Sequence, residues 1–446
     1  MARGGVKQST AGAPVEGPWA LPDGWRWSTI DEVCSYLSRG RSPKYVESNG
    51  TRIINQKCVR WRGLDAKWSK RTSTESAAKL AEDQFLREFD ILWNSTGTGT
   101  IGRACLIKQA DLDEPTVVDT HVTLLRPGSV HPRWLHYWLQ VPFVQKAVAG
   151  TGSTNQVELA RSTILAMPMP IPSMALQEIC VARIDELFAE IDDGEAALGR
   201  ARDDLATWRK ALLKASISGE LTADWRGMKS DLGSETPESA TTLGNNLDEW
   251  TRTTVGEVAS LQGGPAFKSV DYSLEGVFLV RIGDINGGSV TASLQSARLP
   301  FPFADENRRF IVREGDILIA MSGATTAKFG RYAGVEPALL NQRVGRFTIR
   351  NEETLSTDYL AIWLGHQQAI ILKAAYGGAQ PNISAGAIEA MPIVLPPRAE
   401  QSEIVARLHS SLRQVSERSA ELGELAAASS ALRQSILAVA FRGDLA

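Results

Sequence analysis

The chain is poor in the residues that build metal centres and disulfide frameworks. Its 446 residues include four cysteines and five histidines. The cysteines lie far apart and form no CxxC pair, so neither a disulfide framework nor a zinc knuckle is indicated, and reduced, packed thiols are expected. The closest histidines, His131 and His136, have an i, i+5 spacing that does not share one helix face. We therefore expect no metal site.

Long apolar runs are also missing from the sequence. No stretch is long enough to cross a bilayer, and residues 1–17 are small and polar without the apolar core of a signal peptide. We expect a cytoplasmic protein whose residues 1–17 are disordered.

The chain has no overall excess of positive charge. Its formal net charge of -3 argues against a uniformly basic nucleic-acid protein. Charge acts locally, however, because salt screens it beyond roughly 10 Å. One cationic block, residues 39–71, has Glu47 and Asp65 as its only acids. Its cations are Arg39, Arg41, Lys44, Arg52, Lys57, Arg60, Arg62, Lys67, Lys70 and Arg71.

What the sequence does contain is an internal repeat, which has to be recognised before any domain is assigned. Trp25–Val33 resembles Trp250–Val258, and Asp90–Leu92 resembles Asp316–Leu318. Over the rest of each half the shift is 224 residues without a gap. It pairs Gln156 with Gln380, Met167-Pro168 with Met391-Pro392, Val181–Arg183 with Val405–Arg407, and Gly219–Leu221 with Gly443–Leu445. The chain is therefore two tandem copies of one unit.

Each copy changes character partway along. Its first part has short Val/Ile/Leu-rich runs punctuated by Gly, Asn and Pro, as in residues 276–285 and 310–320, which predict a β-rich mixed domain. Its second part follows a proline stop and runs without proline for roughly 45 residues, the length of a helix of about 65 Å. Apolar residues recur there at steps of three and four. They are Leu176, Cys180, Ile184, Leu187, Ile191, Gly194, Leu198, Ala201, Leu205, Trp208, Leu212 and Ala215 in the first copy, and Ile404, Leu408, Val415, Leu422, Leu425, Leu432, Ile436 and Val439 in the second.

This heptad seam predicts that the two helices pair, as an antiparallel coiled coil, rather than each packing only on its neighbouring domain. The expected fold class is α+β, with two β-rich mixed α/β domains separated by two long helices. The predicted boundaries are 18–172 for the first domain, 173–226 for the central helix, 227–246 for a flexible linker, 247–396 for the second domain and 397–446 for the C-terminal helix.

This layout resembles the specificity subunit of Type I restriction-modification systems over nearly the whole chain. The local marks of the resemblance are weak one by one but specific in their order and repetition. They are Leu21–Trp25, Arg281–Ile285, Gly315–Leu318 followed by Ser322-Gly323, Gln380–Ser384, the proline-rich start of each helix with Gln177 or Gln401, and Lys214–Leu221. The resemblance implies that each β-rich domain is a target recognition domain for one half of a split DNA site, and that the helices set the gap and dock two modification subunits.

The sequence lacks complete motifs for cofactor binding, adenine methylation and nuclease activity. Gly97–Gly102 matches GxGxxG, but a cofactor loop needs a helix next, whereas Arg103–Ile107 is strand-like. The Asn/Asp-Pro-Pro-aromatic motif of adenine methylation is absent. The nominal nuclease pair of Asp23 with Asp65 and Lys67 does not recur in the second copy. We expect no catalytic centre and no cofactor in this chain, with S-adenosylmethionine held by the partner methyltransferase.

Phosphate contacts give affinity and base-edge contacts give sequence. The predicted DNA-binding residues of the first domain are Arg39, Arg41, Lys44, Asn55, Gln56, Lys57, Arg60, Arg62, Thr96 and Gln156. Those of the second are Arg281, Asp284, Arg308, Arg309, Ser322, Lys328, Arg331, Arg343 and Gln380, and Arg346 belongs to the same basic set. Trp61 and Trp68 are stacking candidates, although tryptophan in a β-rich domain usually lies in the core.

The expected partners are double-stranded DNA, the modification subunits and restriction subunits. Two alternatives stay open on the sequence. One is a coiled-coil structural adaptor whose end domains bind peptides, and the other is an enzyme with an unrecognised site. Salt-dependent binding to duplex DNA would favour the DNA-reading specificity subunit over both alternatives.

Overall fold

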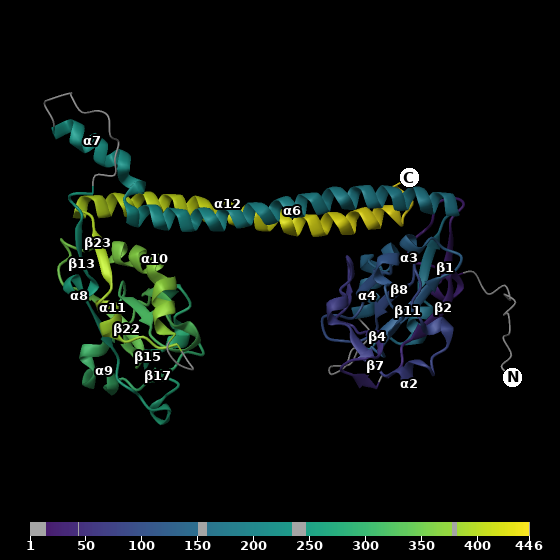
Figure 1. Cartoon of the computed structure of the whole chain (residues 1–446), viewed down its shortest axis with the longest axis horizontal. Coiled ribbons are helices and arrows are strands. Elements are labelled where there is room, and N and C mark those ends of the chain that lie inside the picture. Colours follow the sequence, from purple (N-terminus) through teal and green to yellow (C-terminus); the bar gives the residue numbers. More distant parts are fainter. Residues whose placement is uncertain (1–14, 43, 150–157, 234–246, 377–380, 446) are drawn as a thin grey trace. The chain divides into compact units, whose positions relative to one another are not determined.

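The computed structural model describes residues 15–42, 44–149, 158–233, 247–376 and 381–445 (Figure 1). The chain divides into two compact units. Unit 1 combines Met1–Gly199 with Gly423–Ala446, and unit 2 is Arg200–Leu422. Gly199 and Gly423 are equivalent positions of the repeat, at the 224-residue shift. Each unit therefore contains one β-rich domain, the start of the helix that follows it and the end of the other copy's helix.

Unit 1 is built on two four-stranded sheets. The first has the order β2-β11-β8-β9, from Cys34–Arg39, Val122–Pro127, Ile91–Asn94 and Ala104–Leu106. The second has the order β10-β4-β7-β3, from Thr116–Val118, Thr51–Ile54, Lys70–Thr72 and Tyr45–Val46. All neighbours are antiparallel except β10 and β4. Two further pairs complete the strands: β1 (Arg26–Thr29) with β12 (Pro168–Ile171), and β5 (Val59–Arg60) with β6 (Gly63–Leu64).

Unit 2 repeats this plan. Its first sheet has the order β14-β22-β19-β20-β16, from Ala259–Gly263, Val344–Ile349, Ile317–Ala320, Phe329–Tyr332 and Gly288–Val290. Its second sheet has the order β17-β15-β21-β18, from Arg298–Leu299, Val277–Val280, Ala338–Leu340 and Ile311–Val312. The pair β13 (Thr251–Thr254) and β23 (Pro392–Leu395) corresponds to β1 and β12. The parallel pair β15 and β21 corresponds to β4 and β10. The predicted duplication is thus a duplication of the fold.

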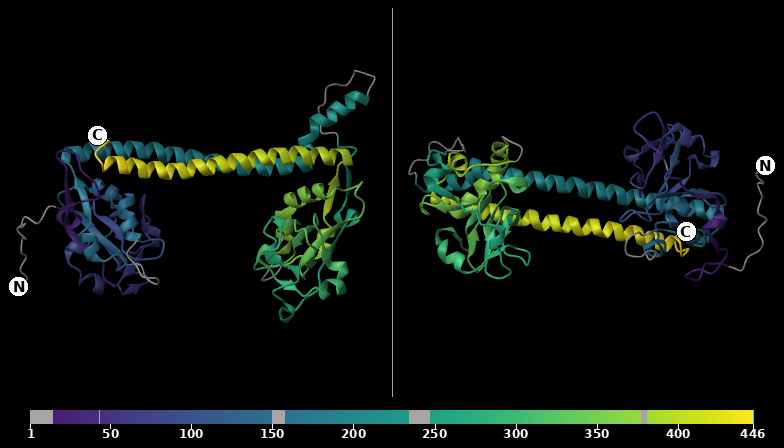
Figure 2. Two further views of the ribbon diagram at one scale, coloured as in Figure 1. Left: turned by 180° about the vertical axis from the view of Figure 1, so that it is seen from behind. Right: turned by 90° about the horizontal axis from the view of Figure 1, so that it is seen from below.

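Short helices cover the sheets of both units (Figures 1 and 2). In unit 1 they are α1 (Ile30–Val33), α2 (Thr74–Ala77), α3 (Pro132–Trp138), α4 (Pro142–Ala149) and α5 (Arg161–Leu165). In unit 2 they are α8 (Val255–Val258), α9 (Pro302–Glu306), α10 (Thr357–Ala375) and α11 (Ala385–Glu389). The buried indoles of Trp134 and Trp138 on α3 pack with Phe441, which comes from the far end of the chain.

The two long helices are α6 (Met174–Ser218) and α12 (Arg398–Ala440). Within unit 1, Arg433 Nη2 lies 2.7 Å from Asp192 Oδ1. Within unit 2, Arg202 Nη2 donates to the Leu422 carbonyl at 3.1 Å. From Asp192 to Arg202 the residue number rises along α6, while that of the contacting α12 residue falls from 433 to 422. The two helices are therefore antiparallel, as the seam predicts.

The seam itself is only partly buried. Cys180, Ile184 and Ile436 join the core of unit 1, and Leu212, Ile404, Leu408 and Val415 join that of unit 2. Trp208, Leu425 and Leu432, predicted in the seam, are 43%, 53% and 51% exposed. A seam that repeats every seven residues drifts about 20° per heptad on a straight helix, so a single partner helix cannot cover all of it.

Two buried glutamines at equivalent positions fix the start of each long helix. Gln177 Oε1 accepts from the His131 N–H at 2.9 Å, and its Nε2 donates to the Pro172 carbonyl at 3.0 Å. Gln401 Oε1 accepts from the Ser356 N–H at 2.9 Å, and its Nε2 donates to the Thr354 and Pro396 carbonyls. Each glutamine thus ties a helix to the domain that precedes it.

The ends of the helices also match. Gly219 and Gly443 both have a positive φ, 82° and 90°, which favours glycine. A Cβ on Gly219 would lie 2.6 Å from Leu247, and one on Gly443 would lie 2.4 Å from Pro22. Each helix therefore ends against the first residues of the domain in its own unit, α6 in unit 2 and α12 in unit 1.

The prediction of a linker over residues 227–246 is wrong for its first seven residues. Ala223–Gly233 form helix α7, so residues 227–233 are helical, and 234–246 lie outside the described residues. The helix starts within reach of a buried network, because Arg226 Nη1 donates to Thr222 Oγ1 at 3.1 Å and also pairs with Glu400. Of the N-terminal segment predicted to be disordered, residues 1–14 lie outside the description. No described helix is long and apolar enough to span a membrane.

Candidate nucleic-acid interface

In each unit, the glycine that follows one strand packs tightly against the backbone of a loop from elsewhere in the domain, at equivalent positions in the two copies. Gly40 follows β2, and a Cβ there would lie 2.2 Å from the carbonyl oxygens of Val118 and Asp119. Gly264 follows β14, and its Cβ would meet the carbonyl oxygens of Leu340 and Asn341 at 2.1 and 2.5 Å. Only glycine fits at such distances. The loop before β11 or β22 is therefore held against the strand end in both units.

A second contact adds two more segments to these loops. The Leu159 N–H donates to the Ser95 carbonyl at 2.8 Å, and the Ile383 N–H donates to the Met321 carbonyl at 2.9 Å. Isolated bridges join Thr96 to Glu158 and Ser322 to Asn382. Thr96 and Ser322 occupy equivalent places, as the repeat implies. We call this assembly of loops the rim of each unit: residues 39–41, 55–57, 94–103, 119–121 and 158–159 in unit 1, and 281–284, 321–328, 341–343 and 382–383 in unit 2.

The rim of unit 1 is a hydrogen-bonded network. Thr96 Oγ1 lies 2.7 Å from His121 Nδ1. The buried Asp119 carboxylate accepts from the His121 N–H at 2.8 Å and from the Tyr45 hydroxyl at 3.2 Å. Burial raises the pKa of Asp119, and burial followed by the charge of Asp119 raises the pKa of Tyr45 to about 12. Arg39 donates to the Thr120 carbonyl and pairs with Glu158.

The rim of unit 2 has the same backbone and different side chains. Arg343 stands where unit 1 has His121, and its φ of 64° is rare for a non-glycine residue. Thr325 Oγ1 donates to the Ile282 carbonyl at 2.9 Å, joining two of the loops. Ser322 is buried, and its hydroxyl has no hydrogen-bond partner among the described residues.

Not every predicted DNA-binding residue of unit 1 is free to reach DNA. Asn55 is 5% exposed; its Oδ1 accepts from the Lys57 N–H at 2.8 Å and its Nδ2 donates to the Trp68 carbonyl at 2.7 Å. As placed, its amide cannot also read a base edge. Arg62 pairs instead with Asp192 (2.9 Å) and Glu195 on α6. Besides Arg62, the exposed members of the set are Arg41, Lys44 and Lys57, whereas Arg60 is half-buried and Gln56 is half-buried beside Gly97.

The predicted residues of unit 2 are more widely spread. Arg281, Asp284, Ser322, Lys328 and Arg343 belong to the rim. Asp284 Oδ2 accepts from the Arg281 N–H at 2.8 Å, so this carboxylate caps its own turn. The remaining four arginines lie elsewhere: Arg308 pairs with Asp305, Arg309 stacks on Phe310, Arg331 pairs with Asp358 on α10, and Arg346 is bonded to Gln262 within the sheet. Gln156 and Gln380 lie outside the described residues.

The glycine-rich sequence Gly97–Gly102 is part of the unit 1 rim. The Thr100 and Ile101 N–H groups donate to the Gly97 carbonyl at 3.0 Å, and the strand predicted after the loop is β9. Asn94 Nδ2 donates to the Thr100 and Gln56 carbonyls, which holds the loop beside residue 56. The segment is a glycine turn between strands, without the helix that a dinucleotide loop requires.

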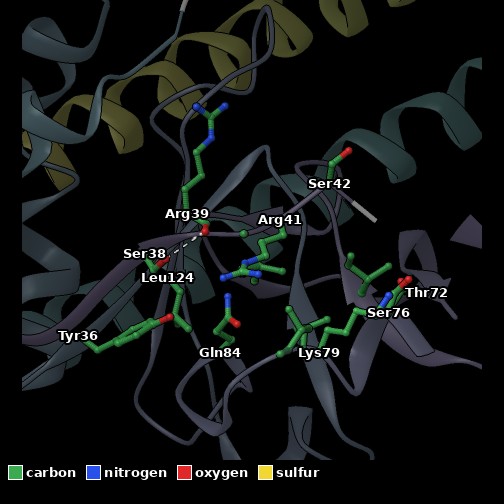
Figure 3. A pocket seen from close by; sticks show the side chains of 15 residues that line it. Tyr36, Ser38, Arg39, Arg41, Ser42, Thr72, Ser76, Lys79, Gln84 and Leu124 are labelled. Atoms are coloured by element: carbon green, nitrogen blue, oxygen red, sulfur yellow. Dashed lines mark hydrogen bonds between the residues drawn. The ribbon is translucent and has the colours of Figure 1, made fainter. Parts of the chain in front are cut away.

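A cavity of about 190 Å³ lies beside the rim of unit 1 (Figure 3). Its floor is apolar, from Ile53, Val117, Val118 and Leu124. Figure 3 shows the Arg41 guanidinium directed toward Gln84, whereas the Arg39 side chain points away from the cavity. Of the two arginines predicted to bind DNA here, Arg41 is therefore directed toward the cavity and Arg39 toward its partners at the rim.

Trp61 and Trp68, the stacking candidates of the sequence, do not lie in the core, where tryptophan in a β-rich domain is usually found. Trp61 is 37% and Trp68 is 45% exposed. The signal was in the neighbours, because Arg60 and Arg62 flank Trp61, and Lys67 and Lys70 lie close to Trp68. Residues 119–121, the middle of the rim, carried no such signal and were missed.

Comparison with known proteins agrees with this arrangement. Residues 247–422 match the family "Type I restriction modification DNA specificity domain". The EcoBI specificity subunit of Escherichia coli is 23% identical over 440 residues, covering 97% of this chain and 88% of that protein. The StySPI specificity subunit of Salmonella potsdam is 22% identical over 464 residues, covering 95% and 90%.

Solved structures show the same fold. A chain described under "complex assembly and conformational transition of the type I R-M system" aligns with a TM-score of 0.71 at 18% identity, over 96% of this chain and all of that one. The HsdS subunit of Thermoanaerobacter tengcongensis aligns with a TM-score of 0.56 at 19% identity, over 96% and all of that chain.

Two β-rich domains of one repeated design, each completed by a pair of helix segments, define a modular DNA-specificity protein. Over nearly its whole length the chain is similar to specificity subunits of Type I restriction-modification systems, and its residues 247–422 match the DNA specificity domain of that family.

Proposed function

We propose that each β-rich domain reads one half of a bipartite site in double-stranded DNA. The observation that carries this proposal is the contrast between frame and rim. The frame repeats contact for contact, as in Gly40 with Gly264 and Leu159 with Ile383. The rim side chains differ, with His121 against Arg343 and Glu158 against Asn382. Two readers of different sequences need one scaffold with two sets of polar groups.

The rim chemistry suits base and phosphate contacts. In unit 1, Lys57, Lys44 and Arg41 supply exposed cations, and the hydroxyl–imidazole pair of Thr96 and His121 offers a donor and an acceptor. In unit 2, Arg343 and Arg281 provide guanidinium forks of the kind that pair with guanine. Asn55 and Arg62 take structural roles in this proposal, because their polar groups are used within unit 1.

The helices supply the second part of the proposed function. α6 and α12 set the gap between the two half-sites and dock two modification subunits, which hold S-adenosylmethionine and transfer its methyl group to adenine. Restriction subunits join the same complex. Exposed apolar residues such as Trp208, Leu425 and Leu432 are available on these helices for protein contacts. The chain itself contributes sequence recognition and no catalytic group.

Domain exchange tests the proposal. Residues 25–166 are replaced by the equivalent segment of a related subunit, and methylated adenines are mapped by single-molecule sequencing in cells that carry the system. One half of the recognised site should change and the other half and the gap should stay. The matched control replaces the second domain instead, which should alter the opposite half. If either exchange changes both halves, the two units do not read independently.

A further inference from the structure

Trp68 occupies an unusual place for a large apolar side chain. It ends a short 3-10 turn, Ala66–Trp68, just before β7, and almost half of its surface is exposed. The turn is fixed, because the Trp68 carbonyl accepts from Asn55 Nδ2 at 2.7 Å and the Trp68 N–H donates to the Asp65 carbonyl at 3.3 Å. Trp68 is therefore presented to solvent by a held backbone.

A second aromatic ring lies on the neighbouring strand. Tyr45 on β3 pairs with Thr72 on β7, and its ring is 44% exposed. Its hydroxyl is anchored on Asp119 at the rim. Trp68 therefore lies before the start of β7 and Tyr45 lies opposite its last residue, and each is hydrogen-bonded to a residue of the rim, Asn55 or Asp119.

Lysines surround both rings. The Nζ atoms of Lys57 and Lys67 lie 5.8 and 5.7 Å from the centroid of the Trp68 ring, and Lys70 Nζ lies 4.4 Å from that of Tyr45. The first two distances are near the limit of a cation–π contact, so the lysine heads are loosely placed and a planar ligand can displace them. Two acids lie close to these side chains: Asp65 is 3.5 Å from Lys67 and 3.9 Å from Arg60, and Asp119 accepts from the Tyr45 hydroxyl.

An exposed aromatic ring within a cationic surround is the pattern of surfaces that bind unstacked nucleotides, since the base stacks and the phosphates meet the cations. A fully paired duplex keeps its bases stacked and gives such a ring nothing to bind. A protein partner would favour an apolar surround for a buried tryptophan, and this surround is charged.

We propose that Tyr45, Lys57, Lys67, Trp68 and Lys70 form a platform for an unpaired DNA base, which stacks on Trp68 while its flanking phosphates contact the lysines. This inference rests on the proposed function for its ligand, DNA, and adds that the half-site of unit 1 is held with a base outside the stack. The repeat gives no such platform in unit 2: at the shift that aligns residues 55–59 with 281–285, Lys57, Lys67 and Trp68 correspond to Gly283, Ser293 and Leu294.

Binding of single-stranded DNA by the full chain provides the test. The probe is a fluorescent oligothymidylate of about 20 nucleotides, long enough for one binding site. Trp68→Ala should weaken its binding roughly 5- to 160-fold, the range that corresponds to loss of one base–aromatic stack. Trp68→Phe keeps a ring and should restore most of the affinity. Trp208→Ala, a similarly exposed tryptophan on α6, is the matched control and should leave binding unchanged.

Salt dependence separates stacking from charge. Removing a phosphate contact with Lys67→Ala should lower the slope of log affinity against log salt by about 0.7, whereas Trp68→Ala should leave the slope as it was. Equal weakening of paired and single-stranded DNA by Trp68→Ala would show an ordinary backbone contact and overturn the platform. Failure to bind the single strand, with domain exchange still switching one half-site, would overturn the platform alone. Trp68-dependent binding without any switch would overturn the bipartite reading instead.

Discussion

At the residue scale, the most consequential buried charge is Asp90. Its carboxylate is fully buried and accepts from Arg126 Nε and Nη2, both at 2.8 Å, and from the Arg87 N–H at 2.7 Å. This hydrogen bonding, with the charge of Asp90, raises the pKa of Arg126. The repeat keeps the turn, since Asp316 caps the Arg313 N–H in the same way.

Asp90→Ala should destabilise unit 1 by about 3 to 5 kcal/mol, because it leaves the Arg126 guanidinium without its buried partner. The free energy of unfolding is measured by urea titration followed by tryptophan fluorescence. Glu186→Ala removes an exposed ion pair with Arg183 in the same unit and should cost at most about 0.5 kcal/mol. Similar losses in the two variants would contradict a structural role for the Asp90–Arg126 pair.

His136 gives unit 1 a defined acid sensitivity. Burial lowers its pKa from 6.5 to about 4. The unfolded chain therefore takes up a proton on this residue near pH 6.5, while the folded chain does not until pH 4. Above pH 6.5 His136 leaves stability unchanged, and between pH 6.5 and 4 the free energy of unfolding falls, by about 2 kcal/mol at pH 5.

The measurement compares urea unfolding of the wild type and His136→Asn at pH 7 and pH 5. The variant has no group that titrates there, so the difference between its two values should be smaller than in the wild type by about 2 kcal/mol. An identical pH dependence in both proteins would assign the acid sensitivity to other groups.

Residue types in the site were predicted better than residue roles. The cationic block of unit 1 is visible in the sequence, but Asn55 and Arg62 were assigned to DNA on composition alone. Their actual partners, the Trp68 carbonyl and the acids of α6, are brought to them by folding. Likewise nothing local marks residues 119–121, which reach the rim only because Gly40 admits their backbone.

At the scale of elements, Gln177 and Gln401 hold the joints between domains and long helices. Gln177→Ala leaves the His131 N–H and the Pro172 carbonyl without partners in a buried place, at a cost of about 2 to 4 kcal/mol. Hydrogen exchange should then accelerate at the His131 amide. Glu178→Ala, the exposed next residue, is the control and should change stability by less than about 0.5 kcal/mol.

Gln401→Ala should act in the same way on unit 2, with faster exchange at the Ser356 amide. Unchanged exchange at both amides would mean that the prolines before the helices fix the joints without the glutamines.

Elements with a strong local pattern were predictable, and their partners were not. The period of the seam and the 224-residue shift identify both helices and the duplication, since each is written in consecutive residues. The division of each helix between two units, and the exposure of Leu425 and Leu432, depend on what packs opposite. Residues 227–233, the second part of α7, were predicted as linker because their polar composition resembles one.

At the scale of the whole molecule, the proposed spacing role of the helices can be tested by lengthening both. Arg202 meets Leu422 across the pair, so residues opposite Leu205 come shortly before Leu422. One heptad inserted after Leu205 and one after Ser419 would add about 10 Å to both strands of the coiled coil at one level. That length is about three base pairs of DNA.

The doubled insertion should keep both half-sites and widen the gap, unless the added phase of roughly 100° between the half-sites, about three base pairs of duplex turn, prevents simultaneous binding. A single insertion should break the register and reduce binding to both. DNA binding is measured with duplexes of graded gap length, alongside methylation. If the doubled insertion leaves the original gap in place, the helices do not set the spacing.

Unit 1 combines two distant stretches of the chain, so it cannot fold completely until the ribosome has synthesised the second of them. Unit 2 is one continuous stretch, and all of it emerges before residue 423. Unit 1 waits for its last helix segment, including Phe441, which lies against Trp134 at a centroid distance of 4.1 Å. At about 5 to 20 residues per second, the 224 residues between Gly199 and Gly423 take roughly 10 to 45 s to synthesise. During that time the nascent first domain exposes the apolar side chains, Trp134 among them, that Phe441 and the end of α12 will cover, so the domain made first is the one completed last.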